Sequence, residues 1–268
     1  MSSKEKVRLT ELLVFRGLCE DTAEAERAIL AGHVLADDTC LTQPGALVDS
    51  RLSIRIKTQR RFASRGGDKL FGALEDFAFD PTGKNCLDVG ASTGGFTDCL
   101  LQCGAAFVVA IDVAYGQFAW SLRQDKRVRL LERTNIRKID PVKAGAPFDL
   151  IVADLSFTSL RSVLPVLAPF SGEGDTLIAL VKPQFELSPT FVDKGIVSDP
   201  GAHIQALEQV IEAATSSGFA PLAVAFSHIT GSKGNIEFFL LAQRFGIPVT
   251  IDMRHVAKQA HERLGQRL

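Results

Sequence analysis

Short apolar segments alternate with segments of helical periodicity from residue 85 to about residue 245, and this alternation constrains the fold most strongly. Buried strands that alternate with helices predict an α/β domain with a largely parallel sheet and right-handed crossovers. The last two strands are joined by a loop too short for a helix, so we expect an antiparallel pair. The predicted strands are Asn85–Val89, Phe107–Val113, Val128–Glu132, Phe148–Asp154, Thr176–Lys182, Leu222–His228 and Ile236–Leu241, and the predicted helices are Gly95–Cys103, Phe118–Gln124, Leu160–Phe170 and His203–Ser217.

The first 58 residues have a different pattern, which predicts a small helix–helix–strand unit. Apolar positions at helical spacing predict helices over residues 7–16 and 22–31, the second with Thr22 as its N-cap. Residues 33–36 and 51–57 read as short strands, and the second has one polar, basic face. A unit of this size has a marginal core, so we expect it to depend on a neighbour or a ligand.

Positive charge is concentrated in one segment, although the net charge of the chain is only −1. Residues 55–69 contain six cations against a single acidic residue, Asp68. Such a cluster suits a nucleic-acid backbone, because neutralised phosphates release counterions, but a solvated linker is an alternative. We therefore predict a module over residues 1–58, a basic linker over 59–67, a larger domain over 68–246 and a basic tail, helical or disordered, over 247–268.

Several classes of protein are disfavoured by what the sequence lacks. It has no apolar run of membrane-spanning length and no secretory signal at its N-terminus, so we expect a cytoplasmic protein. Its five cysteines include no C-x-x-C pair, which favours reduced thiols. Cys99 and Cys103 lie one helical turn apart, but no second Cys/His pair completes a zinc site, so we expect no metal.

A glycine-rich loop follows the first predicted strand of the larger domain. The strand contains Asp88, and the loop passes through Gly90, Gly94 and Gly95 before a helix begins. The spacing is G-x-x-x-G-G rather than the G-x-G-x-x-G of dinucleotide sites, which disfavours an NAD-binding site. Asp112 ends the second strand, 24 residues after Asp88, where a carboxylate can accept hydrogen bonds from ribose hydroxyls.

The loop is better suited to S-adenosylmethionine, whose cationic amine Asp88 could bind. The string D-x-G-A-S-x-G-G-F-T, which includes Ser92, is typical of methyltransferases, and a tight turn in another α/β protein is the alternative. Asn135 is a candidate neighbour of the adenine, although a turn-forming role is equally compatible with its position. Tyr115 and Gln117 are candidates to flank the ribose.

The segments CLDVGASTGGFTDCLL, DLIVADLSFTSL, LVKPQFE and ITGSKGNIEFFL together resemble the TlyA family, whose members are often labelled hemolysin A. The resemblance covers about residues 6–245. It implies a Rossmann-like class I methyltransferase fold of FtsJ type that uses S-adenosylmethionine, with ribosomal RNA or ribosomal subunits as partner. The segment RLTELLVFRGLCEDTAEAERAILAGHVL resembles the alpha-L RNA-binding module. The turn after residue 36 lacks the glycine that is usual in that module.

The family's catalytic Lys–Asp–Lys–Glu tetrad corresponds to Lys69, Asp154, Lys182 and Glu237. Asp154 and Lys182 end neighbouring predicted strands, which is the edge where open α/β sheets bind ligands. Lys182 is the candidate base or positioner for a ribose hydroxyl, and its protonation state is left open. The two carboxylates would orient the lysines, and Lys69 would hold substrate or tune Lys182.

These features predict 2′-O-methylation of a ribose, by family resemblance in a cytidine of ribosomal RNA. One alternative is a methyltransferase-fold RNA-binding protein without catalysis. A membrane-active hemolysin is another, which the missing signal and membrane-length segment oppose. No stable protein partner is evident. The candidate RNA-binding residues are Arg8, Arg27, Arg55, Lys57, Arg60, Arg61 and Arg65.

Overall fold

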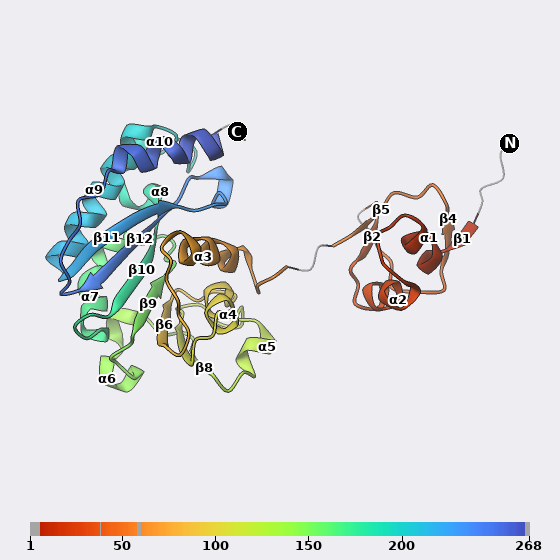
Figure 1. Ribbon diagram of the computed structural model, residues 1–268, viewed down its shortest axis with the longest axis horizontal. Coiled ribbons are helices and arrows are strands. Elements are labelled where there is room, and N and C mark those ends of the chain that lie inside the picture. The colour runs from red at the N-terminus through yellow and green to blue at the C-terminus, as the bar shows by residue number, and fades with distance from the viewer. Residues whose placement is uncertain (1–5, 38, 58–59, 266–268) are drawn as a thin grey trace. The chain divides into compact units, whose positions relative to one another are not determined.

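The chain folds into two compact units, residues 1–60 and residues 61–268 (Figure 1). The computed structural model describes residues 6–37, 39–57 and 60–265, so residue 59 of the predicted linker and the last three residues lie outside the description.

The smaller unit contains two helices and two small antiparallel sheets. Asp21, not the predicted Thr22, caps the second helix, because its side chain accepts the backbone N–H of Glu24. Strand β1 was missed, and its residues were assigned partly to the first helix; a three-residue strand shows too little alternation to be recognised. The elements are β1 (Lys6–Arg8), α1 (Leu9–Phe15), α2 (Thr22–Leu30), β2 (Val34–Ala36), β3 (Thr39–Cys40), β4 (Leu47–Asp49) and β5 (Ile54–Ile56), with β1 paired to β4 and β2 paired to both β3 and β5.

The larger unit is built on a seven-stranded sheet in the order β11-β12-β10-β9-β6-β7-β8. Strands β10, β9, β6, β7 and β8 run parallel, whereas β12 is antiparallel to both β10 and β11. The predicted mostly parallel sheet and its final antiparallel pair are therefore confirmed. The strands are β6 (Asn85–Val89), β7 (Phe107–Ile111), β8 (Val128–Leu131), β9 (Leu150–Ala153), β10 (Thr176–Val181), β11 (Phe219–Phe226) and β12 (Phe238–Arg244).

Helices cover both faces of this sheet (Figure 1). Alternate strand residues point to opposite faces, so Leu87 and Ile151 belong to one buried cluster while Cys86 and Leu150 belong to the other. One face packs against α3 (Arg65–Asp76) and α4 (Gly95–Gln102), and the other packs against α7 (Leu164–Leu167), α9 (Pro200–Ser216) and α10 (Met253–Leu264). The shorter helical segments are α5 (Trp120–Arg123), α6 (Pro141–Ala144) and α8 (Pro183–Glu186), with 3-10 turns at Ile136–Lys138, Pro189–Phe191 and Ser232–Gly234.

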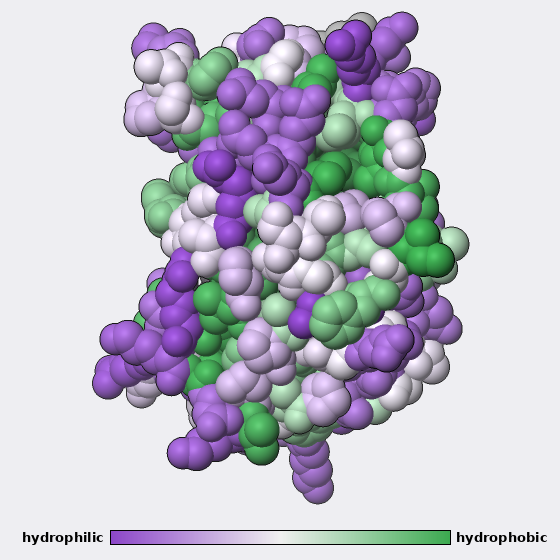
Figure 2. Space-filling model, turned by 90° about the vertical axis from the view of Figure 1, so that its left-hand side faces the viewer, coloured by the Kyte–Doolittle hydropathy of each residue, from purple (hydrophilic) through white to green (hydrophobic). Residues whose placement is uncertain are grey.

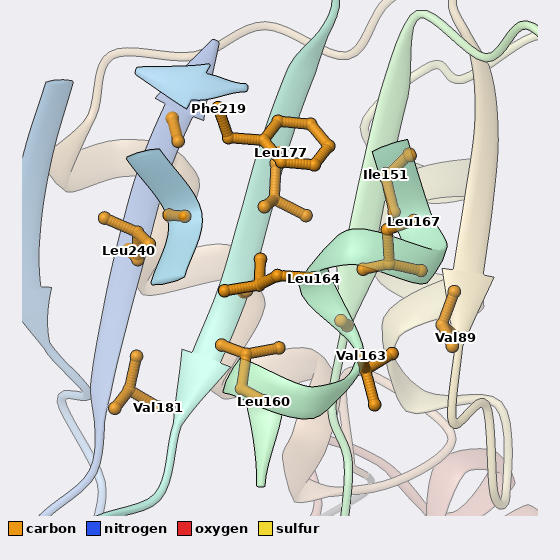
Figure 3. Packing of buried hydrophobic residues seen from close by; sticks show 14 of the residues in the cluster. Val89, Ile151, Leu160, Val163, Leu164, Leu167, Leu177, Val181, Phe219 and Leu240 are labelled. Carbon is orange, nitrogen blue, oxygen red and sulfur yellow. The ribbon is translucent and has the colours of Figure 1, made fainter. Parts of the chain in front are cut away.

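The helix predicted over Leu160–Phe170 is wrong as a single element. It is divided into a 3-10 turn at Leu160–Ser162, helix α7, and a second 3-10 turn at Ala168–Phe170. Pro165 and Pro169 explain the division, because proline removes a helical hydrogen bond. The apolar residues of this segment are nevertheless buried against the sheet. Figure 3 shows their side chains lying against those of strands β10 and β9.

Helix α3 begins at Arg65, three residues before the predicted start of the larger domain at residue 68. Ser64 accepts the backbone N–H of Gly66 and so caps the helix. Arg65, which the sequence placed in a linker, is therefore the first residue of α3.

The C-terminal segment is helical and packs on the larger unit through Ala257, Ala260 and Leu264 of α10. His261 of this helix lies with its Nε2 2.9 Å from Nδ1 of His203, which is fully buried on α9. The second ring nitrogen of His203 lies 3.0 Å from the carbonyl oxygen of Val197. Both nitrogens of His203 are thus used within the fold.

This buried histidine makes folding sensitive to acid. Burial lowers the pKa of His203 from 6.5 to about 4. Between pH 6.5 and about 4, this histidine is therefore protonated in the unfolded chain but neutral in the folded chain. We expect the free energy of unfolding to fall by about 3 kcal/mol from pH 7 to pH 4 through this group. Urea unfolding of the wild type and of His203→Gln measures this effect. The difference between their free energies of unfolding should shrink as the pH falls. A constant difference would contradict the prediction.

In the part of the chain that the structure describes, no helix is both long enough and apolar enough to cross a membrane. On the face of the larger unit shown in Figure 2, hydrophilic residues lie between the hydrophobic ones.

Candidate active site

Four charged residues from distant parts of the sequence meet at one edge of the sheet. Asp154 directly follows β9, and Lys182 directly follows the neighbouring parallel strand β10. Glu237 directly precedes β12, and because β12 is antiparallel to β10, its start lies at the same edge. Lys69 comes from the first turns of α3. The sheet topology therefore gathers the four predicted catalytic side chains.

The four side chains form two ion pairs. Lys182 Nζ lies 2.5 Å from Asp154 Oδ1, and Lys69 Nζ donates to Glu237 Oε2 at 2.6 Å. Each lysine is only 8% exposed and Glu237 is 2% exposed, so each buried lysine has a carboxylate of its own. Buried charges are tolerated when they are paired in this way. Lys182 also donates to the hydroxyl of Ser156 at 3.1 Å, which fixes the direction of its ammonium group further.

Two neighbours of Glu237 were not singled out from the sequence. Gln184 on α8 donates its Nε2 to Glu237 Oε1 at 3.4 Å, which gives that carboxylate a second side-chain partner. Gly231 lies so close that a Cβ there would stand 2.1 Å from the same carboxylate oxygen. Their only sequence signal is proximity to Lys182 and Glu237 in the segments LVKPQFE and ITGSKGNIEFFL.

A cavity of about 430 Å³ opens beside the Lys182–Asp154 pair. Its size is within the range of small-molecule sites. Asp154 and Ser156 line it, so the cavity and the ion pairs share a wall. Of the predicted cofactor-binding residues, Gly90, Ser92, Asp112 and Asn135 line the cavity, whereas Asp88, Gly94 and Gly95 are not among the lining residues.

The side chain of Asp88 is completely buried beneath the loop. Its Oδ2 accepts the hydroxyl of Thr97 at 2.6 Å, while its Oδ1 is buried without a hydrogen-bond partner. Burial raises the pKa of Asp88 to about 7, and the negative charge of nearby Asp154 adds to the effect. A cation bound close to this carboxylate would stabilise its ionised form.

The glycines of the loop exclude a larger residue for different structural reasons. Gly90 has a φ of +87°, and a Cβ there would lie 2.3 Å from the backbone oxygen of Asp154. Gly95 permits helix packing, because its Cβ would lie 2.2 Å from Ser64 Oγ at the start of α3. Gly94 has a φ of +93°, and a Cβ there would lie 2.5 Å from Cδ1 of Leu122. Gly90 is thus the glycine that holds the loop against the Asp154 backbone.

Replacing Gly90 with alanine should destabilise the loop at the cavity. We expect a loss of roughly 2–4 kcal/mol in the free energy of unfolding, from left-handed strain and the clash with Asp154. Gly116→Ala is a matched control, because Gly116 also has positive φ but has nothing within 4 Å of its Cβ position. It should lose only the strain, about 1–2 kcal/mol. Denaturant unfolding compares the two, and equal losses would refute the close approach of the loop.

Asp112 and Asn135 organise the other side of the cavity. Asp112 accepts the backbone N–H groups of Ser92 and Ala114, each at 2.7 Å, and so ties the glycine loop to the end of β7. Asn135 lines the cavity and also caps a 3-10 turn by accepting the N–H of Arg137, so its turn-forming role is confirmed and its place near the adenine stays a prediction.

Of the two residues proposed beside the ribose, Gln117 lines the cavity. The exposed Tyr115 is not among the lining residues and instead stacks with Arg133, whose guanidinium lies 4.1 Å from the ring centre. Several other polar or aromatic residues also line the cavity but were not predicted from the sequence, namely Thr134, Arg137, Ser156, Phe157 and Thr158.

The predicted RNA-binding cations, Arg8, Arg27, Arg55, Lys57, Arg60, Arg61 and Arg65, are all exposed. Arg61 is partly committed to the fold, since its guanidinium lies 3.7 Å from the centre of the Phe71 ring. Cys99 on α4 is buried, and Cys103, which directly follows α4, is partly buried. Within the described residues, no group of three or more His, Cys, Asp or Glu side chains is arranged to hold a metal ion.

The sequence and the fold both have known relatives. Residues 62–244 match the model of the FtsJ-like methyltransferase family. The chain is 46% identical over 244 residues to YqxC of Bacillus subtilis, named as a candidate rRNA methyltransferase, with 90% of this chain and 86% of YqxC covered. It is 44% identical over 238 residues to the 16S/23S rRNA (cytidine-2′-O)-methyltransferase TlyA of Mycobacterium tuberculosis, with 88% and 89% covered.

Among solved structures, that of a candidate hemolysin from Streptococcus thermophilus is similar over 99% of both chains, with a TM-score of 0.75 and 37% sequence identity. The relatives therefore match nearly the whole chain, including the smaller unit. On this evidence the chain belongs to the TlyA family and contains an FtsJ-like methyltransferase domain.

Proposed function

We propose that this protein transfers a methyl group from S-adenosylmethionine to the 2′-hydroxyl of a cytidine in ribosomal RNA. The observation that supports this most is the Lys182–Asp154 ion pair, whose carboxylate lines the cavity, with the Lys69–Glu237 pair at the same sheet edge. We infer the substrate from the name of the relative from Mycobacterium tuberculosis.

The residues around the cavity fit S-adenosylmethionine, which is cationic at both its sulfonium and its amine. Asp112 and Asp154 line the cavity, and the unpartnered oxygen of Asp88 lies buried beneath the neighbouring loop. Gly90 and Ser92 would face the ligand with backbone groups and a hydroxyl, and Asn135 would face it from the opposite loop. When bound, the cofactor supplies an electrophilic methyl group.

The protein's own side chains would prepare the hydroxyl. Lys182 Nζ is the group that would hold the ribose oxygen in line or accept its proton, and orientation alone is worth roughly 7–11 kcal/mol. Asp154 and Ser156 fix the position of that nitrogen. Lys69, held by Glu237, whose carboxylate also accepts from Gln184, would bind the ribose or phosphate of the substrate.

The RNA would be held by cations outside the cavity. We propose that residues 1–58 form the RNA-binding module, that the basic linker continues its surface, and that residues 68–246 carry out the transfer. The exposed cations of Arg8, Arg27, Arg55 and Lys57 are suited to phosphate contacts. A nucleotide in structured RNA must leave its stack to reach a buried lysine.

Transfer of labelled methyl groups tests this proposal. The protein is incubated with methyl-labelled S-adenosylmethionine and with ribosomal subunits from a strain that lacks the enzyme. Label should be retained in the RNA after protein removal, and heat-denatured protein should give none. RNA binding without label would instead support a non-catalytic RNA-binding protein, and leakage of dye from lipid vesicles without label would support the hemolysin reading.

A further inference from the structure

Asn235 lies two residues before Glu237 and is almost completely buried, with 1% exposure. Its side-chain amide makes three hydrogen bonds to backbone groups. The Oδ1 accepts the N–H of Val197 at 3.0 Å, and Nδ2 donates to the carbonyls of Gly195 at 2.8 Å and Ser232 at 3.1 Å. One planar amide thus joins two segments that are far apart in the sequence.

The first of these segments is the turn of residues 231–235, which lies against the Glu237 carboxylate. The backbone N–H of Gly231 donates to the carbonyl of Asn235 at 2.8 Å and closes the turn. The same glycine approaches Glu237 so closely that its Cβ would stand 2.1 Å from Oε1. The position of this carboxylate therefore depends on the conformation of the turn.

The second segment, residues 193–197, is anchored to the body of the larger unit. Asp193 and Ile196 exchange backbone hydrogen bonds, which closes a tight hairpin. The carbonyl of Val197 contacts Nε2 of the buried His203 on α9 at 3.0 Å. Asn235 consequently ties its turn to a point that is fixed by the long helix α9.

We propose that Asn235 is a positioning residue for methyl transfer, which acts by holding the 231–235 turn so that Glu237 is presented to Lys69. This inference rests on the proposed function, because it concerns the rate of that reaction. Asn235 is not among the residues that line the cavity, so we expect it to make no direct contact with the cofactor. It affects the reacting atoms only through Glu237 and Lys69.

An asparagine is required here because the site needs both an acceptor and a donor in one plane. Asn235→Asp keeps the acceptor for Val197 but turns a carboxylate oxygen toward two carbonyl oxygens. Asn235→Ala removes all three bonds without adding a charge, and so provides a second variant if the aspartate interferes with folding. Gln243→Glu is the matched control: Gln243 donates its Nε2 to the carbonyl of Gly174, at the other end of the same strand β12.

Methylation kinetics of the full-length variants test the proposal. We expect kcat to fall on the order of 10²-fold in both Asn235 variants, because small displacements of catalytic groups have effects of this size. The Kd for S-adenosylmethionine and the KM for RNA should stay within about twofold, as should all constants of Gln243→Glu. Variants that keep kcat within about threefold of the wild type would overturn the proposal.

A double-mutant cycle with Glu237→Gln separates positioning from general weakening of the fold. If Asn235 acts through Glu237, Asn235→Ala should reduce kcat much less in the Glu237→Gln background than in the wild type. Full additivity of the two losses would overturn the inference. A wild-type protein that places no methyl group on ribose would refute the proposed function itself, whereas normal methylation by both Asn235 variants would refute only this inference.

Discussion

Replacing Lys182 with methionine is expected to reduce ribose methylation by roughly 10³-fold, a loss within the range of positioned acid–base groups. Methionine fills a similar volume but can neither hold the hydroxyl oxygen nor accept its proton. Lys182 is not among the residues that line the cavity, so the Kd for S-adenosylmethionine should change little. Asp154 loses its partner; its side chain as a whole is 22% exposed, but the Oδ1 atom that pairs with Lys182 is buried.

Single-turnover methylation of ribosomal subunits measures the rate, and calorimetric titration measures cofactor affinity. Lys126→Met, at an exposed position on the larger unit, is the control for loss of one positive charge and should behave as the wild type. A Lys182→Met protein that keeps more than about a tenth of the wild-type rate would remove Lys182 from the chemical step.

Replacing Lys69 with methionine is expected to destabilise the protein by about 3–5 kcal/mol, because it leaves a buried carboxylate without its counter-ion. Glu237 is 2% exposed, and its remaining side-chain partner is the Gln184 amide at 3.4 Å. The double variant Lys69→Met, Glu237→Gln removes both charges and should recover most of the loss. Methylation should stay impaired in both variants, since neither contains the Lys69 ammonium.

Urea unfolding of the two variants measures this difference. A Lys69→Met protein as stable as the wild type would show that the Glu237 carboxylate does not need its lysine, which would contradict the buried ion pair. A double variant no more stable than the single variant would attribute the loss to packing of the lysine stem instead.

The sheet could be predicted because its parallel strands are buried on both faces and appear as short apolar runs. The helix over Leu160–Phe170 could not, because its apolar spacing is satisfied equally by two 3-10 turns and a short helix around Pro165 and Pro169. In the smaller unit, the missed strand β1 is held by pairing with β4, far along the chain, and no local pattern records that pairing.

The candidate site divides in the same way. Asp154 and Lys182 could be placed together from the sequence, because both end neighbouring parallel strands. Lys69 and Glu237 could be assigned only through the family resemblance, since their contact spans 168 residues. The packing roles of Gly94 and Gly95, and the place of Gln184 beside Glu237, depend on which helices and loops lie nearby in three dimensions. Local spacing does not contain that information.

Nucleoside analysis of the product is the most direct test of the claim that the Lys182–Asp154 pair beside the cavity and the Lys69–Glu237 pair at the same sheet edge direct a methyl group to a ribose oxygen. Ribosomal RNA treated with the protein and labelled S-adenosylmethionine is digested to nucleosides and examined by mass spectrometry. If this claim holds, label appears in 2′-O-methylcytidine with wild-type protein and is nearly absent with Lys182→Met. Label on a base, or equal ribose labelling by both proteins, would contradict it.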